Sequence, residues 1–110
     1  MNFQNNQLFG TIPKTMGSLQ HLYYLGLHDN ALIGTVPSDS FSDLTNLKTL
    51  HLENNDLEGI IGGDDPLCLL RVMVIAPIHG SLEHLTADCG RGLLQLKKPE
   101  ISCSCCTECY

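Results

Sequence analysis

Six cysteines are the residues of this 110-residue sequence that could carry the most distinctive chemistry. All of them lie in the second half of the chain, and four are crowded into "CSCCTEC" near its end. Cysteines can pair as disulfides, bind soft metals such as zinc, or work as a redox couple. An even number in a terminal segment favours a disulfide framework and an oxidising compartment. The disulfide candidates are Cys68, Cys89, Cys103, Cys105, Cys106 and Cys109.

Zinc and redox chemistry are the alternatives to disulfides. A closed zinc site usually takes its ligands as two pairs from separate knuckles, whereas these four cysteines occupy seven residues. Cys106 and Cys109 form a Cys-x-x-Cys pair, but no strand-helix-strand unit is predicted that would lower a thiol pKa. We therefore expect no metal and no cofactor.

The connectivity of the disulfides is not determined by the sequence, because six cysteines allow many pairings. A bridge between the adjacent Cys105 and Cys106 would be badly strained. We expect Cys68 and Cys89 each to pair with a cysteine in the segment from Cys103 to Cys109, which would tie the end of the chain to its body.

The sequence contains a segment that occurs three times, and any binding site outside the cysteines must be built on this repeat. It reads "FQNNQLFGTIP", then "LHDNALIGTVP", then "LENNDLEGIIG", and its asparagines Asn6, Asn30 and Asn55 are 24 and 25 residues apart. Leucines in the order Leu-x-x-Leu-x-Leu precede the second and third asparagines, beginning at Leu22 and Leu47. Self-similarity with a period of this length is typical of a solenoid.

The leucines predict one short strand in each repeat. Leu25 and Leu27 alternate with Gly26 and His28, which gives a strand one buried face. Strands are expected at residues 24–28, 49–53 and 84–88, parallel and adjacent, with a partial strand near Phe3. A single strand cannot bury its face alone, so the repeats must stack into a parallel sheet. The expected core is Leu8, Ile12, Leu19, Leu22, Leu25, Leu27, Leu32, Val36, Leu44, Leu47, Leu50, Leu52, Leu57, Ile61, Leu82 and Leu85.

The other repeated residues have roles in the turns. Each asparagine amide can satisfy backbone groups that the turning chain leaves unpaired. The glycine four residues later permits a tight backbone, and the proline after it fixes φ where the chain starts back. Glycine and proline in every period argue against amphipathic helices.

Over residues 1–62 this frame resembles the plant-type leucine-rich repeat family, Leu-x-x-Leu-x-Leu-x-x-Asn-x-Leu-x-Gly-x-Ile-Pro. The resemblance implies an α/β-type repeat: a leucine-rich repeat solenoid with short parallel strands on the concave face and an irregular or 3-10 convex side. The end of the chain, "LTADCG" followed by "PEISCSCCTEC", resembles the C-terminal ends of leucine-rich repeat proteins of diatoms. That resemblance implies a Cys-rich C-terminal cap.

Three segments are expected along the chain: repeats at 1–62, an extended connection at 63–81, and a degenerate last repeat with a Cys-rich cap at 82–110. Leu82 follows Leu47 by 35 residues, and Gly90 stands where an asparagine is expected. The chain opens halfway through a repeat, so we expect it to be the C-terminal fragment of a longer parent with further N-terminal repeats. Phe3, Leu8 and Ile12 should then form an exposed apolar edge.

Composition excludes several classes of function. Twelve acidic and six basic residues give a formal charge of −6, which argues against nucleic acid or an anionic membrane as partner. The longest apolar stretch, residues 66–78, is too short to insert into a membrane and contains Arg71. The N-terminus lacks the features of a signal peptide. Phosphate-loop and hydrolase motifs are absent from the sequence, so we do not expect an enzyme.

Stacked repeats would align exposed side chains in columns on the concave face. The columns hold Gln4, His28, Glu53 and Asp88; Gly26, His51 and Thr86; and Tyr24, Thr49 and His84. These residues could equally be solvated surface, and a metal or acid-base cluster among them lacks a burying pocket. The predicted ligand-binding residues are Tyr24, His28, Thr49, His51, Glu53, His84, Thr86 and Asp88.

The function expected from these patterns is recognition. The resemblance implies a non-catalytic, secreted or receptor-like extracellular module that binds a protein, peptide or glycan on its concave face. One alternative is a purely structural piece that closes the C-terminal end of a longer solenoid. A further alternative is a cap that binds metal through its cysteines.

Overall fold

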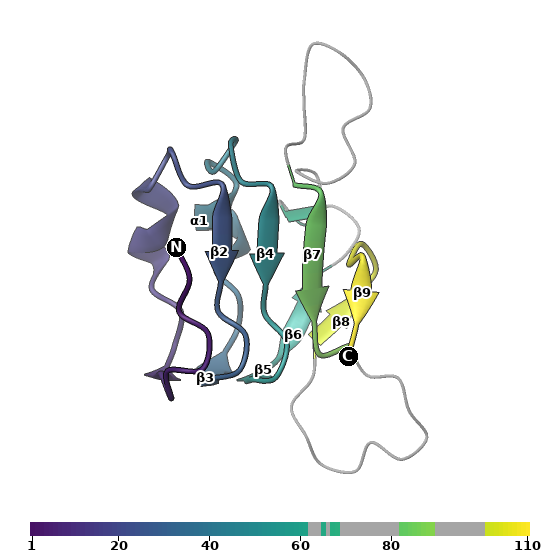
Figure 1. Ribbon diagram of the computed structural model, residues 1–110. Helices are drawn as coiled ribbons and strands as arrows, with labels where there is room; N and C mark the ends of the chain where they lie inside the picture. The colour runs from purple at the N-terminus through teal and green to yellow at the C-terminus, as the bar shows by residue number, and fades with distance from the viewer. Residues whose placement is uncertain (62–64, 66, 69–81, 90–100) are drawn as a thin grey trace.

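The computed structural model describes residues 1–61, 65, 67–68, 82–89 and 101–110 (Figure 1). The described strands pair in parallel throughout. The main sheet has the order β2-β4-β7-β9, and the smaller sheets have the orders β1-β3-β5 and β6-β8. The elements are β1 (Phe9–Gly10), η1 (Lys14–Ser18), β2 (Tyr24–Gly26), β3 (Ala31–Gly34), α1 (Ser38–Phe41), β4 (Thr49–His51), β5 (Asp56–Leu57), β6 (Gly59–Ile61), β7 (His84–Ala87), β8 (Ile101–Cys103) and β9 (Glu108–Cys109).

The central strands β2, β4 and β7 confirm the parallel pairing that the leucines predict. Leu25 lies opposite Leu50, which lies opposite Leu85, and all three are fully buried. The partial strand expected near Phe3 is a single parallel bridge between Asn2 and Gly26. Beside it, the Phe3 amide donates a 2.8 Å hydrogen bond to the Gly26 carbonyl. The alternation of leucine with smaller or polar residues therefore sets the register of the main sheet.

The turn after each strand uses the residues that tolerate a left-handed backbone. Asn5, Asp29 and Asn54 occupy equivalent positions and have φ values of 57°, 59° and 58°. Asparagine and aspartate are the non-glycine residues that adopt this conformation most readily. Gly34 and Gly59 follow with φ values of 81° and 115°. The repeated glycine is therefore required by backbone geometry.

The chain returns on the far side of the main sheet through short helices (Figure 1). Pro13 precedes the 3-10 helix η1, and Pro37 precedes α1, as the fixed φ of proline favours. A Cβ atom on Gly17 would lie 2.2 Å from the carbonyl oxygen of Ser40. The two helical turns thus pack in backbone contact, which only glycine permits at that position.

The tail, which we define as residues 101–110, forms a further coil of the repeat. Strand β8 pairs with β6, and β9 pairs with β7, so that Thr86 lies opposite Glu108 and Ala87 opposite Cys109. The Thr107 hydroxyl donates to the Leu85 carbonyl and accepts from the Leu85 amide, 22 residues away in sequence. This separation is close to one repeat period. The tail therefore adds strands to both sides of the molecule.

Most of the predicted core is buried; the exceptions are Val36, which is only partly buried, and residues of the first coil. Leu8 and Leu19 are each 36% exposed, because no described coil packs on the outer side of the first one. Ile12 is only 4% exposed, so including it in the exposed apolar edge was wrong. Phe3 is partly buried, while Leu8 and Phe9 border an apolar depression at that end. Core residues that the sequence analysis missed are Phe41, Leu67, Cys68, Ala87, Cys89 and Ile101.

Most of the connection expected at residues 63–81, together with Gly90, lies outside the described residues. Within that connection, Leu67 and Cys68 are described and buried. Across the described parts of the chain, no helix has the length and apolar character needed to span a bilayer.

Candidate binding face

The predicted columns are in register on the main sheet. Tyr24, Thr49 and His84 lie opposite one another across β2, β4 and β7. Gly26, His51 and Thr86 do the same, and Glu108 of β9 joins their column.

Beyond the strand ends, the backbone keeps the same register between coils. The Asp29 amide donates to the Glu53 carbonyl at 3.1 Å. This register places His28 beside Glu53, as the sequence predicts. We call the surface formed by these columns the concave face.

A hydrogen-bonded chain at the centre of this face fixes the orientation of His51. The Thr86 hydroxyl donates to the Glu53 carboxylate, so its single proton is not available to His51. His51 Nδ1, which lies 2.7 Å from Thr86 Oγ1, must therefore be the donor in that contact. The proton sits on Nδ1, and Nε2 of a neutral His51 keeps its lone pair for another partner.

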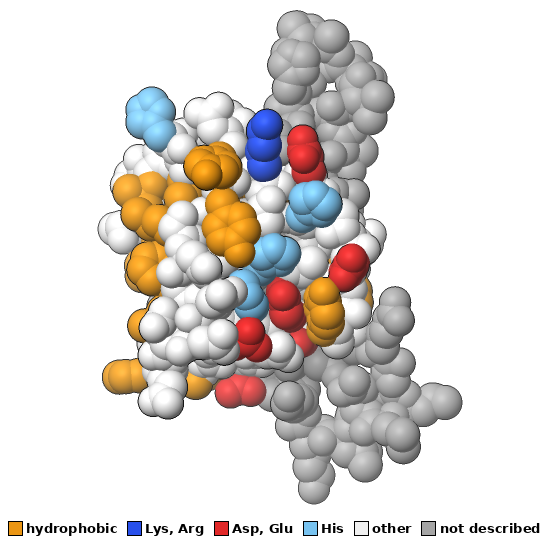
Figure 2. All heavy atoms as spheres, viewed as in Figure 1, with side chains coloured by type: hydrophobic (Ala, Val, Ile, Leu, Met, Phe, Trp, Pro, Cys, Tyr) orange, Lys and Arg blue, Asp and Glu red, His pale blue; other side chains and the backbone are white. Residues whose placement is uncertain are grey.

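Two aromatic rings flank His51 on the same face. Its ring centroid lies 5.7 Å from that of Tyr24 and 5.2 Å from that of His28, both in edge-to-face geometry. His28 Nε2 is 3.9 Å from an Asp29 carboxylate oxygen, and His28 Nδ1 is buried without a hydrogen-bond partner. Figure 2 shows histidine side chains at the middle of the face with acidic side chains beside them, while another histidine lies apart at the upper left.

Three of the predicted ligand-binding residues are less open than expected. Glu53 and Thr86 are 8% and 4% exposed, because the tail strand β9 lies beside β7. Asp88 is half-buried, and its two carboxylate oxygens accept the amides of Asn54 and Asn55 at 2.9 and 3.0 Å. These residues support the face from beneath or from its edge. Tyr24, His28, Thr49 and His51 are half-buried on it, and His84 is exposed.

The tail supplies two residues of this region that the sequence analysis missed. The Tyr110 amide donates to the Ala87 carbonyl at 2.9 Å, which extends the pairing of β7 with β9. The Tyr110 hydroxyl donates to the Glu108 carboxylate at 2.7 Å. The sequence did carry a signal for this strand. Polar Glu108 and amphipathic Tyr110 alternate with Cys109, and in the structure the first two are exposed while Cys109 is half-buried.

The hydrogen bond to Glu108 raises the pKa of Tyr110 above its ordinary value of 10.0, with smaller contributions from desolvation and from the charges of Glu108 and Glu53. Deprotonation would lose the donated hydrogen bond and put a phenolate beside a carboxylate. We therefore expect Glu108→Gln to lower the pKa of Tyr110 in an alkaline titration followed by NMR. Glu58→Gln, which changes a carboxylate that lines a separate depression, is the control and should leave that pKa unchanged. An unchanged pKa in Glu108→Gln would contradict the contact.

The described part of the molecule is acidic and poor in cations. Its basic side chains, apart from histidine, are Lys14 and Lys48. Glu53, Asp88 and Glu108 carry carboxylates in or beside the columns of the face. Complementary charge on a partner would therefore be positive.

The histidine-carboxylate group on this face does not have the geometry of a metal site. Among the described residues, the one group of three potential ligands whose atoms all lie within 4.8 Å of one another is Cys89, Cys103 and Cys106. The hypothesis of a metal cluster formed by His28, His51, Glu53 and Asp88 is thus not supported by their arrangement.

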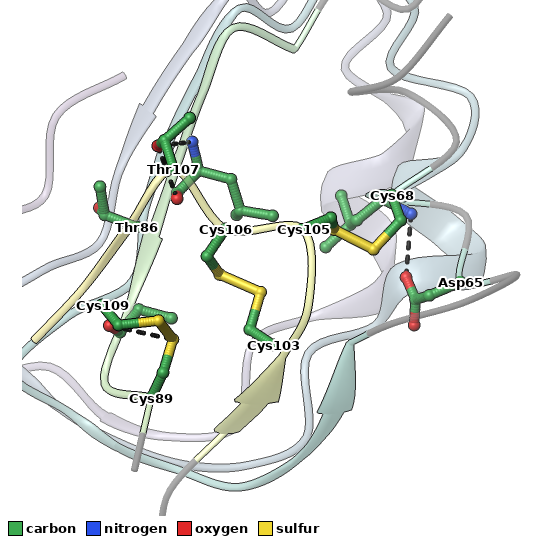
Figure 3. Close-up of a disulfide and its surroundings, with 12 residues drawn as sticks. Asp65, Cys68, Thr86, Cys89, Cys103, Cys105, Cys106, Thr107 and Cys109 are labelled. Atoms are coloured by element: carbon green, nitrogen blue, oxygen red, sulfur yellow. Dashed lines mark hydrogen bonds between the residues drawn. A yellow bond between two sulfur atoms is a disulfide. The ribbon is translucent and has the colours of Figure 1, made fainter. Parts of the chain in front are cut away.

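The cysteines pair as three disulfides in and around the tail (Figure 3). Cys68 pairs with Cys105, Cys89 with Cys109, and Cys103 with Cys106, which leaves no free cysteine. Cys68 and Cys89 thus each bond to a cysteine of the tail. The tail is joined covalently both to the segment after β6 and to the end of β7.

Comparisons with known proteins locate the repeats in a family. Residues 1–60 match a family model described as leucine rich repeat. The chain is 48% identical over 52 residues to a probable leucine-rich-repeat receptor-like serine/threonine-protein kinase of Arabidopsis thaliana, covering 47% of this chain and 5% of the kinase. It is 40% identical over 58 residues to podocan of Mus musculus, covering 52% of this chain and 10% of podocan. No solved structure matches the chain significantly.

Proposed function

The chain belongs to the leucine-rich repeat family, and we propose that it is a non-catalytic extracellular recognition module whose concave face binds a protein or peptide segment. The family supports interaction between proteins as the general role. The observation that carries the finer proposal is the fixed His51 imidazole at the centre of an acidic face. Tyr24, His28, Thr49, His51 and His84 would contact the ligand, while Glu53, Thr86 and Asp88 would support them.

His51 is suited to recognition because its ring needs no reorganisation on binding. The chain of hydrogen bonds through Thr86 to Glu53 holds Nδ1 and leaves Nε2 as an acceptor for an N–H or O–H donor. Rigid, pre-oriented groups lose little conformational freedom when a ligand binds. Tyr24, whose ring lies edge-on to His51, adds an amphipathic aromatic surface of the kind that dominates binding energies at interfaces.

Charge favours a ligand that carries lysine or arginine. Carboxylates surround the histidines, and the described cations are Lys14 and Lys48. A basic side chain could donate to His51 Nε2 and interact with the carboxylates around it, which would favour both the rate and the specificity of association. We therefore propose a cationic peptide segment as the ligand and treat a glycan as the competing outcome.

An extracellular location and a longer parent belong to the same proposal. Three disulfides persist most readily in an oxidising compartment. The chain spans 5% and 10% of the two relatives described above, and further N-terminal repeats would cover Leu8 and Phe9. In such a parent, residues 1–62 would continue the solenoid and residues 82–110 would close it.

Selection from a displayed library of random dodecapeptides tests the ligand proposal. We expect the oxidised chain to enrich peptides rich in lysine and arginine. Binding of a selected peptide should weaken about tenfold in His51→Ala and in Tyr24→Ala, since each truncation at a central contact costs more than about 1 kcal/mol. Ile33→Ala, at a residue that is 51% exposed on β3, is the matched control and should bind normally.

Four outcomes would count against this proposal. Peptides without positive charge would exclude the cationic ligand, and selective binding on a glycan array would replace it with a carbohydrate. Equal binding by the His51 and Ile33 variants would move the site away from the concave face. Failure to select any ligand would favour the purely structural role.

A further inference from the structure

The structure divides the six cysteines into an isolated bridge and a group of four. Cys68 and Cys105 form the isolated bridge. In the other group, the sulfur atoms of Cys89, Cys103 and Cys106 all lie within 4.8 Å of one another, and Cys109 is bonded to Cys89. Two disulfides of the tail are therefore in direct proximity, as Figure 3 shows.

Three of these sulfur atoms, with the fourth bonded to one of them, have separations near those of a tetrahedral zinc site. A zinc-sulfur distance of about 2.3 Å requires sulfur atoms about 3.8 Å apart. The sulfurs of Cys89, Cys103 and Cys106 already lie within 4.8 Å of one another, so their unbonded pairs are within about 1 Å of this separation. A disulfide holds its two sulfurs about 2 Å apart, so each bonded pair must separate by roughly a further 1.7 Å once its bridge is open.

The spacing of these residues in the sequence supports the same chemistry independently. Cys103, Cys106 and Cys109 follow one another at intervals of three residues, the Cys-x-x-Cys spacing of zinc knuckles. Cys105 falls outside this series, and it pairs with Cys68. The fourth ligand, Cys89, lies two residues beyond the end of β7, in a separate part of the chain.

The backbone can hold this group together without the disulfides. Strand β9 pairs with β7 directly before Cys89, and the Thr107 hydroxyl makes two hydrogen bonds to Leu85. The Tyr110 amide adds a hydrogen bond to Ala87 at 2.9 Å. Cys89 and Cys109 would therefore stay adjacent after their bridge opened.

We propose that Cys89, Cys103, Cys106 and Cys109 bind one zinc ion when their two disulfides are reduced. Two equivalents of a dithiol reductant supply four electrons and four protons, which convert the two bridges into four thiols and leave two oxidised dithiols. Binding of Zn²⁺ then displaces four protons and leaves four thiolates on the metal. The tail can thus be cross-linked in two alternative ways, by disulfides in oxidising surroundings and by a zinc-thiolate site in reducing surroundings.

Metal titration of the reduced full chain tests this site. The chain is reduced with a phosphine without oxygen and titrated with Co²⁺ and then Zn²⁺. We expect one ion per chain by native mass spectrometry and the visible absorption of tetrahedral thiolate Co²⁺. The double variant Cys68→Ser with Cys105→Ser should keep both signals. Cys103→Ser with Cys106→Ser should weaken zinc binding at least 100-fold.

The folding of each variant is checked by amide hydrogen exchange in β2 and β4, whose pairing does not involve the tail. The proposal is overturned if the Cys68 and Cys105 variant binds no stoichiometric metal, or if both double variants lose metal equally while folded. Binding of metal by the oxidised chain would also overturn it. None of these outcomes depends on a peptide ligand, so the zinc site is tested independently of the binding function proposed for the concave face.

Discussion

Replacing Asn55 with alanine is expected to destabilise the protein by about 3 kcal/mol, because it leaves several buried backbone groups unpaired. The side-chain amide is 4% exposed. Its Nδ2 donates to the carbonyls of Leu27, Leu52 and Glu53 at 2.9, 2.9 and 3.3 Å. Its Oδ1 accepts the Leu32 amide at 3.1 Å. One side chain thus satisfies the turn of its own repeat and joins it to the preceding repeat.

Asn30 provides a matched comparison for this prediction. It makes the same kind of bonds to the coil before it, donating to the Phe3 carbonyl and accepting the Leu8 amide, but it is only half-buried. Water can replace part of what the side chain supplied, so Asn30→Ala should cost about 1 to 2 kcal/mol. Urea unfolding of both variants measures the difference. Equal losses would show that burial does not determine how much this asparagine contributes to the free energy of unfolding.

Asn55→Asp separates the contribution of the acceptor Oδ1 from that of the donor Nδ2. The aspartate would keep the acceptor for the Leu32 amide, but it would place negative charge against three carbonyl oxygens in a buried site. We expect it to destabilise the protein at least as much as the alanine variant. A stability close to that of the unsubstituted chain would contradict the donor role of Nδ2.

The sequence predicted best those parts of the fold in which burial of the leucines also determines the backbone register. Leu25, Leu50 and Leu85 share a register because a one-residue slip would turn each of them to solvent. The columns of the concave face follow from that register. The asparagine network was predictable as well, since a turn inside the coil leaves backbone groups that need a polar partner.

The tail could not be predicted from the same pattern, although it forms a further coil. The positions of Leu85 and Ala87 in β7 correspond to Thr107 and Cys109 in the tail, as the pairing of Ala87 with Cys109 shows. Hydrogen bonds from Thr107 and disulfides there replace apolar packing. Sequence reasoning therefore treated the cysteines as a terminal cap and missed that β9 lies beside β7.

This omission also explains the errors about the binding face. A cap remote from the face would leave Glu53 and Thr86 open to solvent. Instead, Glu108 occupies the next position in the column of His51 and Thr86, and the two supporting residues are buried. The tail is thus continuous with the surface proposed to bind a ligand.

Removal of the disulfides singly is expected to destabilise the protein in the order of the loops they close. The bridges Cys68–Cys105, Cys89–Cys109 and Cys103–Cys106 span 37, 20 and 3 residues. Restriction of the unfolded chain predicts contributions of about 4, 3 and less than 2 kcal/mol. Serine replacement of both partners in each bridge, followed by urea unfolding, measures the three losses. Alkylation and mass spectrometry of the oxidised chain should first find no free thiol.

Effects on ligand binding should follow a different order, because the bridges lie at different distances from the face. Cys89–Cys109 reinforces the pairing of β9 with β7. The hydrogen bonds of Thr107 and Tyr110 should keep the two strands paired without it, but β9 should then separate from β7 more often and expose Thr86 transiently. We expect that variant to bind the selected peptide several-fold more weakly. Cys68–Cys105 joins the tail to the segment after β6, so its removal should cost more stability but leave the affinity of the folded fraction unchanged. Parallel losses of stability and affinity in both variants would mean that the tail acts only through global unfolding.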